Sequence, residues 1–186
     1  MSKILISGYY GFANAGDEAM LTAIIESLRQ VEKNVELTVL SGNPEDTAAK
    51  HQVCSVYRFN PLGIIQAMKD SELIISGGGS LLQDVTSKRS LLYYLSIIGL
   101  GKFFGKKVML FAQGIGPIRA KWARKLTSLV CNEADLITVR DSESAAELIE
   151  MGVKPEKITV TADSVLSLNP VTKECGQYLL QEAGVD

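Results

Sequence analysis

The sequence predicts an α/β fold in which a Rossmann-like parallel sheet is flanked by helices. Short runs rich in Ile, Leu and Val recur along the chain, and each is short enough to be a buried strand. Segments with apolar residues at helical spacing lie between these runs, which is the pattern of βαβ units. Glycine-rich loops follow several of the runs, and in open parallel sheets ligands bind at the loops that follow the strands.

The composition is that of an ordinary globular protein. The chain has 186 residues, of which 46% are hydrophobic and 22% are charged. Its net charge of -2 offers no general attraction to nucleic acid, so we expect no nucleic-acid partner. Cys54, Cys131 and Cys175 form no CxxC pair, and we expect reduced, structural thiols. No cluster of metal-ligating residues is visible, so we predict neither a metal nor a cofactor.

The expected elements follow in order. The predicted strands are residues 3–7, 36–40, 53–57, 72–76, 108–112, 136–139 and 157–161. The predicted helices are residues 18–31, 61–69, 90–104, 121–131, 142–152 and 173–183. Ser142 is expected to cap the helix that it begins. Residues 46–52 are polar and are expected to form a solvated loop.

The first expected loop, residues 8–18, reads GYYGFANAGDE and leads into a helix. Its glycines let the backbone approach a ligand closely, but their spacing is not that of the dinucleotide-binding loop. Asp17 follows Gly16 where a phosphate-binding loop would have lysine. The acidic pair Asp17 and Glu18 therefore favours sugar hydroxyls as ligands. The alternative is that both acids only complement the helix dipole.

Two further glycine turns follow predicted strands. Gly77, Gly78, Gly79 and Ser80 come directly after one strand, where exposed N–H groups could meet an anion or a sugar. Gln113 and Gly114 follow the next strand, with the Gln113 side chain as a candidate donor. For both turns, close packing of strand on helix is the alternative explanation.

Arg140 ends another predicted strand and is followed by Asp141 and Ser142. From that position its guanidinium could enter the ligand crevice and bind a carboxylate or phosphate through two hydrogen bonds. A surface pair with Asp141 is the alternative. His51 is the one histidine, and we do not expect it to be catalytic because of its solvated surroundings.

The segment 91–104 is apolar nearly all round and is followed by lysines. Core burial is the main prediction for it, and a membrane-surface patch is the alternative. The segment is shorter than the roughly 20 apolar residues that a bilayer crossing needs. The N-terminus shows no secretion signal, so a cytoplasmic location is expected.

Four segments together resemble the polysaccharide pyruvyltransferase family. They are GYYGFANAGDE at 8–18, ISGGGSLLQD at 75–84, AQGIGP at 112–117 and VRDSES at 139–144. The resemblance runs to about residue 163 and is closest to bacterial members that modify the secondary cell-wall polysaccharide to which S-layer proteins attach.

The resemblance implies a two-domain fold similar to the GT-B glycosyltransferases, with the active site between two Rossmann-like halves. Residues 1–170 would be the N-terminal domain, and residues 171–186 would begin the connection to a missing C-terminal domain. The family's catalytic histidine belongs to that second half, and no histidine follows His51 here. The isolated chain is therefore expected to be inactive.

The implied reaction transfers the enolpyruvyl carbons of phosphoenolpyruvate to two hydroxyls of a sugar as a cyclic ketal. Arg140 and Ser142 would bind this donor. Asn14 and Asp17 would meet the acceptor, with Asp17 as a catalytic base. The other residues of the acceptor wall would be Gly77, Gly78, Gly79, Ser80, Gln113 and Gly114. The implied acceptor is a lipid-linked saccharide containing N-acetylmannosamine, which suits a protein working near the inner membrane face.

Two other functions remain open from the sequence. The same architecture and glycine loops serve nucleotide-sugar binding, so the chain could be half of a sugar-nucleotide glycosyltransferase. It could also be a non-catalytic domain that binds a glycan without turning it over.

Overall fold

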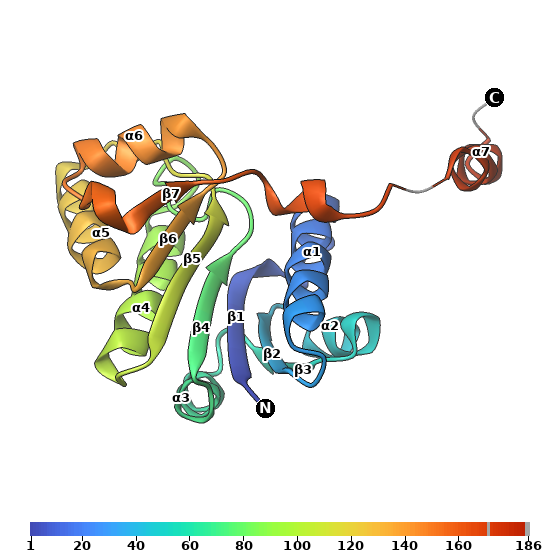
Figure 1. Ribbon diagram of the computed structural model, residues 1–186, viewed down its shortest axis with the longest axis horizontal. Coiled ribbons are helices and arrows are strands. Elements are labelled where there is room, and N and C mark those ends of the chain that lie inside the picture. The colour runs from blue at the N-terminus through green and yellow to red at the C-terminus, as the bar shows by residue number, and fades with distance from the viewer. Residues whose placement is uncertain (171, 185–186) are drawn as a thin grey trace.

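The computed structural model describes residues 1–170 and 172–184 and confirms the α/β fold. Figure 1 shows a single sheet with helices on both faces. All pairings between its strands are parallel, and the strand order is β3-β2-β1-β4-β5-β6-β7. The strands are β1 (Lys3–Tyr10), β2 (Glu36–Ser41), β3 (Cys54–Tyr57), β4 (Leu73–Gly77), β5 (Lys107–Gln113), β6 (Leu136–Val139) and β7 (Ile158–Val160).

The strand order places a topological switch point between β1 and β4. The chain first builds outward from β1 to β3, then returns to add β4 on the other side of β1 and continues to β7. Ile6 pairs with Ile75 and Ser7 with Ser76 across this junction. The loops after β1 and β4 leave the sheet in opposite directions, which opens a crevice at the carboxyl ends of these strands.

The helices form two layers around the sheet. They are α1 (Ala15–Val31), α2 (Pro44–His51), α3 (Pro61–Asp70), α4 (Lys88–Phe103), α5 (Lys121–Glu133), α6 (Ser142–Glu150) and α7 (Lys173–Glu182), with short 3₁₀ turns at η1 (Pro155–Lys157) and η2 (Ser164–Ser167). One apolar cluster joins α1 to one face of β1, β2 and β4. A larger cluster joins α3, α4, α5 and α6 to the opposite face.

Residues 46–51 belong to a helix rather than to the expected loop, and Gln52 is the left-handed residue that ends it. Asn43 caps α2 by accepting a hydrogen bond from the Asp46 N–H, and Pro44 occupies the first turn. Arg29 of α1 donates to the carbonyl oxygens of His51 and Gln52 at 3.0 and 2.8 Å. These contacts stabilise a helix whose own sequence is too polar to show an apolar stripe.

Strand β1 continues to Tyr10, although a loop was expected from Gly8 onward. The Tyr10 side chain is fully buried, and its hydroxyl donates to the Gly77 carbonyl oxygen at 2.6 Å. A Cβ atom at Gly8 would lie 2.3 Å from the Tyr10 ring, so glycine is required there. The first ligand loop therefore begins after Tyr10.

Helix α6 is capped by Asp141 and not by Ser142. The Asp141 carboxylate accepts a hydrogen bond from the Ser144 N–H at 2.7 Å, and Ser142 is the first helical residue. Asp and Ser both cap helices well, so the sequence Asp141-Ser142 does not by itself show which of the two residues is the cap.

Helix α4 is a core helix, as predicted. Leu91, Leu95 and Ile98 are buried in the larger apolar cluster, whereas Leu92 and Phe103 are exposed. Within the described residues, no helix combines the length and the apolar character that a membrane crossing requires.

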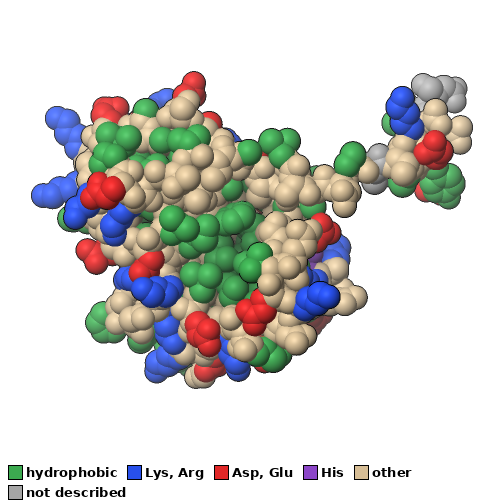
Figure 2. Space-filling model, viewed as in Figure 1, with side chains coloured by type: hydrophobic (Ala, Val, Ile, Leu, Met, Phe, Trp, Pro, Cys, Tyr) green, Lys and Arg blue, Asp and Glu red, His purple; other side chains and the backbone are tan. Residues whose placement is uncertain are grey.

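The face of the sheet that carries α1 is less completely covered than the other. Met109 and Phe111 on β5 point toward this face and are half-buried, whereas the alternating Val108 and Leu110 on the other face are fully buried. Figure 2 shows apolar side chains gathered over β4 and β5, between α1 and β7.

Helix α7 lies apart from the sheet (Figure 1) and has no buried residue. Residue 171 and residues 185–186 of the expected connecting segment lie outside the described part of the chain. The division at residue 170 stays a prediction.

Candidate active site

A cavity of about 370 Å³ lies at the carboxyl ends of β1 and β4. This is the switch point of the sheet, where ligands are expected. Its walls come from the end of β1, from the loops after β1 and β4, and from the first two turns of α4. The lining residues are Tyr9, Asn14, Asp17, Ser80, Leu81, Gln83, Thr86, Ser90 and Tyr94. Three predicted acceptor-binding residues, Asn14, Asp17 and Ser80, therefore share one cavity.

Asn14 has a structural task at this cavity. Its Oδ1 accepts hydrogen bonds from the N–H groups of Gly16 and Asp17 at 3.0 and 3.3 Å, which caps α1. The amide nitrogen of Asn14 is then the group that can donate to a ligand.

The acidic pair at the start of α1 divides into two environments. Asp17 lines the cavity, and its pKa is raised, first by partial burial and then by the charge of Glu18. Glu18 points elsewhere: its Oε1 accepts a hydrogen bond from the Gly11 N–H at 2.8 Å, and its Oε2 lies 3.6 Å from His51 Nε2. Asp17 is therefore the carboxylate available to a ligand.

The three consecutive glycines after β4 are not equivalent. Gly77 and Gly78 are buried, and a Cβ at Gly78 would lie 2.9 Å from the Tyr10 hydroxyl. Close packing, the alternative explanation, accounts for these two. Gly79 has a φ of +57°, and a Cβ there would lie 3.0 Å from Asp17 Oδ1. Gly79 and Ser80 are thus the part of this turn that reaches the cavity.

Arg140 lies beside the same turn. Its Nη2 donates to Ser80 Oγ at 3.2 Å. Its Nε lies 3.3 Å from Asp141 Oδ2, and its Nη1 lies 3.5 Å from Asp163 Oδ2. A Cβ at Gly114 would lie 2.7 Å from Arg140 Cζ and 2.6 Å from Ser80 Oγ. The absence of a side chain at Gly114 is what lets Arg140 and Ser80 meet.

Gln113 and Ser142 stand outside the cavity lining. Gln113 is fully buried and donates to Ser76 Oγ at 2.9 Å, so its amide supports the sheet edge from behind. Ser142 is exposed at the start of α6, one residue after Asp141. Its predicted contact with a donor stays a prediction.

His51 is not solvated as expected. Its side chain is only 11% exposed because α2 packs it toward Glu18. It does not line the cavity that holds Asp17.

Sequence reasoning missed Arg58, which follows β3 and is only 4% exposed. Its Nη2 donates to the Tyr94 hydroxyl, one of the groups lining the cavity, at 3.4 Å. The sequence does hold a signal, because Arg58, like Arg140, directly follows a predicted strand. Asp163, a partner of Arg140 in the loop between β7 and η2, was also missed.

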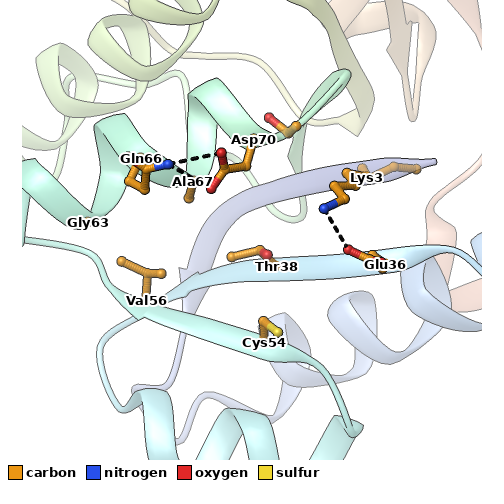
Figure 3. A pocket seen from close by; sticks show the side chains of 11 residues that line it. Lys3, Glu36, Thr38, Cys54, Val56, Gly63, Gln66, Ala67 and Asp70 are labelled. Carbon is orange, nitrogen blue, oxygen red and sulfur yellow. Dashed lines mark hydrogen bonds and ion pairs between the residues drawn. The ribbon is translucent and has the colours of Figure 1, made fainter. Parts of the chain in front are cut away.

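A second cavity, of about 340 Å³, lies at the opposite edge of the sheet (Figure 3). Lys3 Nζ and Glu36 Oε2 form an ion pair there at 3.2 Å, and Gln66 donates to both oxygens of Asp70 at 2.9 Å. Its polar side chains thus pair with one another. None of the predicted site residues lines it.

The chain belongs to the polysaccharide pyruvyl transferase family, whose model matches residues 14–174. The match includes every predicted site residue. No curated protein sequence matches the chain.

Solved structures show the same fold at low sequence identity. HepE from Anabaena, solved with UDP and glucose, is 13% identical with a TM-score of 0.60, and the match covers 99% of this chain and 50% of HepE. UDP-GlcNAc 2-epimerase from Neisseria meningitidis, bound to UDP-GlcNAc, is 12% identical with a TM-score of 0.58 and coverage of 97% and 50%. A glycosyltransferase from Rickettsia africae is 11% identical with a TM-score of 0.58 and coverage of 100% and 50%. The chain spans about half the length of these proteins and has the Rossmann-like architecture of one half of a GT-B-like enzyme.

Proposed function

We propose that this chain is the N-terminal half of a polysaccharide pyruvyltransferase that moves pyruvate from phosphoenolpyruvate onto a sugar as a ketal. One observation carries the proposal: Arg140 and Asp17 flank the same short turn at the switch point of the sheet. Ser80 accepts a hydrogen bond from Arg140, and Gly79 lies against Asp17. A cation for an anionic donor and a carboxylate for a hydroxylated acceptor therefore stand on two sides of one loop.

Arg140 is the group proposed to bind phosphoenolpyruvate. The donor carries a carboxylate and a phosphate, and a guanidinium binds either through two parallel hydrogen bonds. The 3.5 Å contact with Asp163 is long, so a donor anion could take its place. Asp141 would keep its place as the cap of α6, where hydrogen bonds from Ser144 lower the pKa of its carboxyl group. Ser142, at the positive end of the α6 dipole, is the second proposed donor contact.

Asp17 is the proposed base for the acceptor. Its raised pKa brings it closer to that of an effective proton acceptor at neutral pH. The Asn14 amide and the Ser80 hydroxyl are the proposed partners of the other sugar hydroxyls. Gly79 keeps the wall free of side chains, while Gly77, Gly78, Gln113 and Gly114 support it from behind.

The proposed reaction proceeds by addition to C2 of the donor. Protonation of the methylene carbon makes C2 electrophilic, and a first hydroxyl oxygen bonds to it as Asp17 takes the hydroxyl proton. The bond from C2 to the phosphate oxygen then breaks, phosphate leaves, and the second hydroxyl closes the ketal. The two sugar hydroxyls together lose two protons. The methylene carbon gains one proton as it becomes a methyl group, and the departing phosphate gains the other, so the reaction balances. The proposal places the general acid in a C-terminal half, so this chain alone would be inactive.

The acceptor proposed is N-acetylmannosamine in a lipid-linked precursor of a cell-wall polysaccharide. Such a precursor is presented at the inner face of the membrane, so a cytoplasmic protein at that surface fits the proposal. S-layer anchoring is the process that this modification would serve.

The test is phosphate release from phosphoenolpyruvate with an N-acetylmannosamine-terminated acceptor. We expect release by this chain joined to a matching second half and not by the chain alone. Arg140→Ala and Asp17→Asn should each lower the rate of release by roughly 10²-fold or more, whereas Arg119→Ala, which removes an exposed arginine outside the cavity, should not. Absence of release by a folded two-domain protein across several such acceptors would contradict the proposal.

Half of a sugar-nucleotide glycosyltransferase is the second candidate. The fold likeness to a glycosyltransferase and to proteins solved with UDP-sugars favours it. Release of UDP from a UDP-sugar, with no phosphate from phosphoenolpyruvate, would support this candidate. Glycan binding without release of either product would point to a non-catalytic binding domain.

A further inference from the structure

Arg58 is a cation buried between aromatic rings. Its guanidinium donates to the Gly8 carbonyl oxygen at 3.5 Å and to the Tyr94 hydroxyl at 3.4 Å, both long contacts, and its Nε has no partner in the part of the chain that the structure describes. Among the described residues, no carboxylate lies within ion-pair distance of it. A buried charge is costly unless it is paired, so this position favours an anionic ligand.

Aromatic rings surround the Arg58 guanidinium. Its Cζ lies 4.4 Å from the ring centre of Tyr93 and 5.2 Å from that of Phe59. The rings of Tyr9, Phe12 and Tyr94 lie 5.3 to 5.9 Å away. Such rings stabilise the cation without neutralising it. The side chains of Tyr9, Phe12 and Phe59 are themselves 40 to 61% exposed.

An apolar groove of about 310 Å³ begins at Arg58 and runs between α3 and α4. Its lining residues are Arg58, Phe59, Pro61, Ile64, Ile65, Tyr93, Ser96, Ile97 and Leu100. Arg58 is the only charged group among them. The groove therefore has one cationic position, and its other walls are mostly apolar, with Ser96 and the Tyr93 hydroxyl as the polar groups of its lining residues.

Arg58 also separates this groove from the candidate active site. Tyr93 lines the groove, whereas its neighbour Tyr94 lines the cavity that holds Asp17. The Arg58 guanidinium contacts both tyrosines. A molecule with an anionic group at Arg58 could thus place an apolar chain in the groove and a polar group near Asp17.

We infer that Arg58 and the α3–α4 groove form a binding site for a single-chain amphiphilic phosphate, with the phosphate at Arg58 and the apolar chain in the groove. The inference rests on the proposed function, because it names where a lipid-linked acceptor would bind. Its test measures binding and not turnover. If decyl phosphate does not bind here, the phosphate-release assay can still support the transferase. If no phosphate is released, binding of decyl phosphate can still support this site.

The experiment is calorimetric titration with decyl phosphate below its critical micelle concentration. Decyl glucoside supplies the same chain without charge, and inorganic phosphate supplies the charge without the chain. Arg58→Met removes the cation and retains an apolar side chain, and Leu100→Glu places a negative charge in the groove. Arg89→Met, at the exposed start of α4, and Leu129→Glu, on the exposed surface of α5, are the matched controls.

We expect decyl phosphate to bind more tightly than either partial probe. Arg58→Met should weaken it by about tenfold or more, the loss expected for a hydrogen bond to a charged group. Leu100→Glu should weaken it as well, and both controls should bind like the parent protein. Arg58→Lys, which keeps the charge, should retain part of the affinity and serves as the second test if Arg58→Met fails to fold.

Three results would overturn the inference. They are no binding of decyl phosphate by the parent protein, equal binding of decyl phosphate and decyl glucoside, and affinity unchanged by both Arg58→Met and Leu100→Glu. The last result would leave Arg58 as a structural cation held by its aromatic rings.

Discussion

The two edges of the sheet carry similar kinds of polar side chains but use them differently. At the amino ends of the strands, charged side chains are paired within the protein. Lys3 forms an ion pair with Glu36. Asp135 accepts hydrogen bonds from Lys102 at 2.6 Å and from the Val108 N–H at 2.9 Å. At the carboxyl ends, Asp17 has a raised pKa, and Arg58 Nε has no hydrogen-bond partner among the described residues.

This difference separates stability from function within one domain. Groups that satisfy each other at short distance contribute to folding. Arg140 is paired as well, but its contact with Asp163 is long, at 3.5 Å, and a donor anion could replace it. Groups left uncompensated cost stability and persist where a ligand completes them. Each edge also has a cavity of similar volume, about 340 Å³ and about 370 Å³, so cavity size alone does not identify the site.

The largest expected effect is on catalysis at the carboxyl edge. Arg140→Ala should lower kcat/KM for phosphoenolpyruvate in the two-domain protein by roughly 10²-fold or more, because a charge-stabilising donor is lost. Lys3→Met at the amino edge should leave kcat/KM unchanged, since its ion pair with Glu36 is exposed. Steady-state kinetics of both variants would measure this. A similar fall in kcat/KM for both would contradict a functional difference between the two edges of the sheet.

The next effect is on stability at the amino edge. Burial raises the pKa of Asp135, but hydrogen bonds from Lys102, the Val108 N–H and Lys107 outweigh it and lower the pKa to about 2. Asp135 is exposed, so water screens these contacts, and Asp135→Asn should cost roughly 1 to 1.5 kcal/mol of unfolding free energy at pH 7, less than the full pKa shift would give. The folded pKa lies below the unfolded one, so this stabilisation is present above about pH 4 and is lost as the pH falls toward 2.

Urea denaturation of the parent protein and of Asp135→Asn at pH 7 and pH 2.5 would check this. The two proteins should differ at pH 7 and converge in acid. A constant difference at both values would mean that Asp135 stabilises the fold without its charge.

A smaller effect is expected where Arg140 meets Ser80. Gly114→Ala would place a Cβ 2.7 Å from Arg140 Cζ, so it should displace the guanidinium and weaken phosphoenolpyruvate binding by about tenfold, the equivalent of one lost charged hydrogen bond. Gly99→Ala in α4 is the control, because a Cβ there meets nothing within 4 Å. Fluorescence or calorimetric titration would compare them, and unaltered affinity in Gly114→Ala would argue against donor binding at Arg140.

The smallest effect concerns Asp17. Its pKa is raised in the folded state, so ionising it costs stability as the pH rises through its unfolded and then its folded pKa. Asp17→Asn should therefore raise the Tm relative to the parent protein at pH 7 and not at pH 3. Thermal denaturation at both values would show this. If the Tm of Asp17→Asn instead falls below that of the parent at pH 7 and not at pH 3, the charge of Asp17 stabilises the folded protein.

The sequence was sufficient for the strands and for most helices because buried apolar runs and helical periodicity are local patterns. It was insufficient for α2. Asn43 and Pro44 are typical of a helix start, but the helix that follows has almost no apolar residues to show helical spacing. It also misplaced the end of β1, since Tyr10 is held by the distant Gly77 carbonyl. Contacts between segments far apart in the chain are not encoded in any local pattern.

The candidate site shows the same limit. Asn14, Asp17, Ser80 and Arg140 were predicted because each lies in a loop that follows a strand. Arg58 also follows a strand, but its burial depends on rings from distant segments, so its environment could not be predicted.

The most direct test of the central claim is an NMR titration of the ¹⁵N-labelled two-domain protein with phosphoenolpyruvate. We expect saturable amide shifts at the carboxyl edge, at Gly79, Ser80, Gly114 and Arg140. The amides around the amino-edge cavity, at Gly63, Asp70 and Ser71, should not move. Shifts confined to the amino edge, or no saturable shift at the carboxyl edge, would contradict the assignment of the active site.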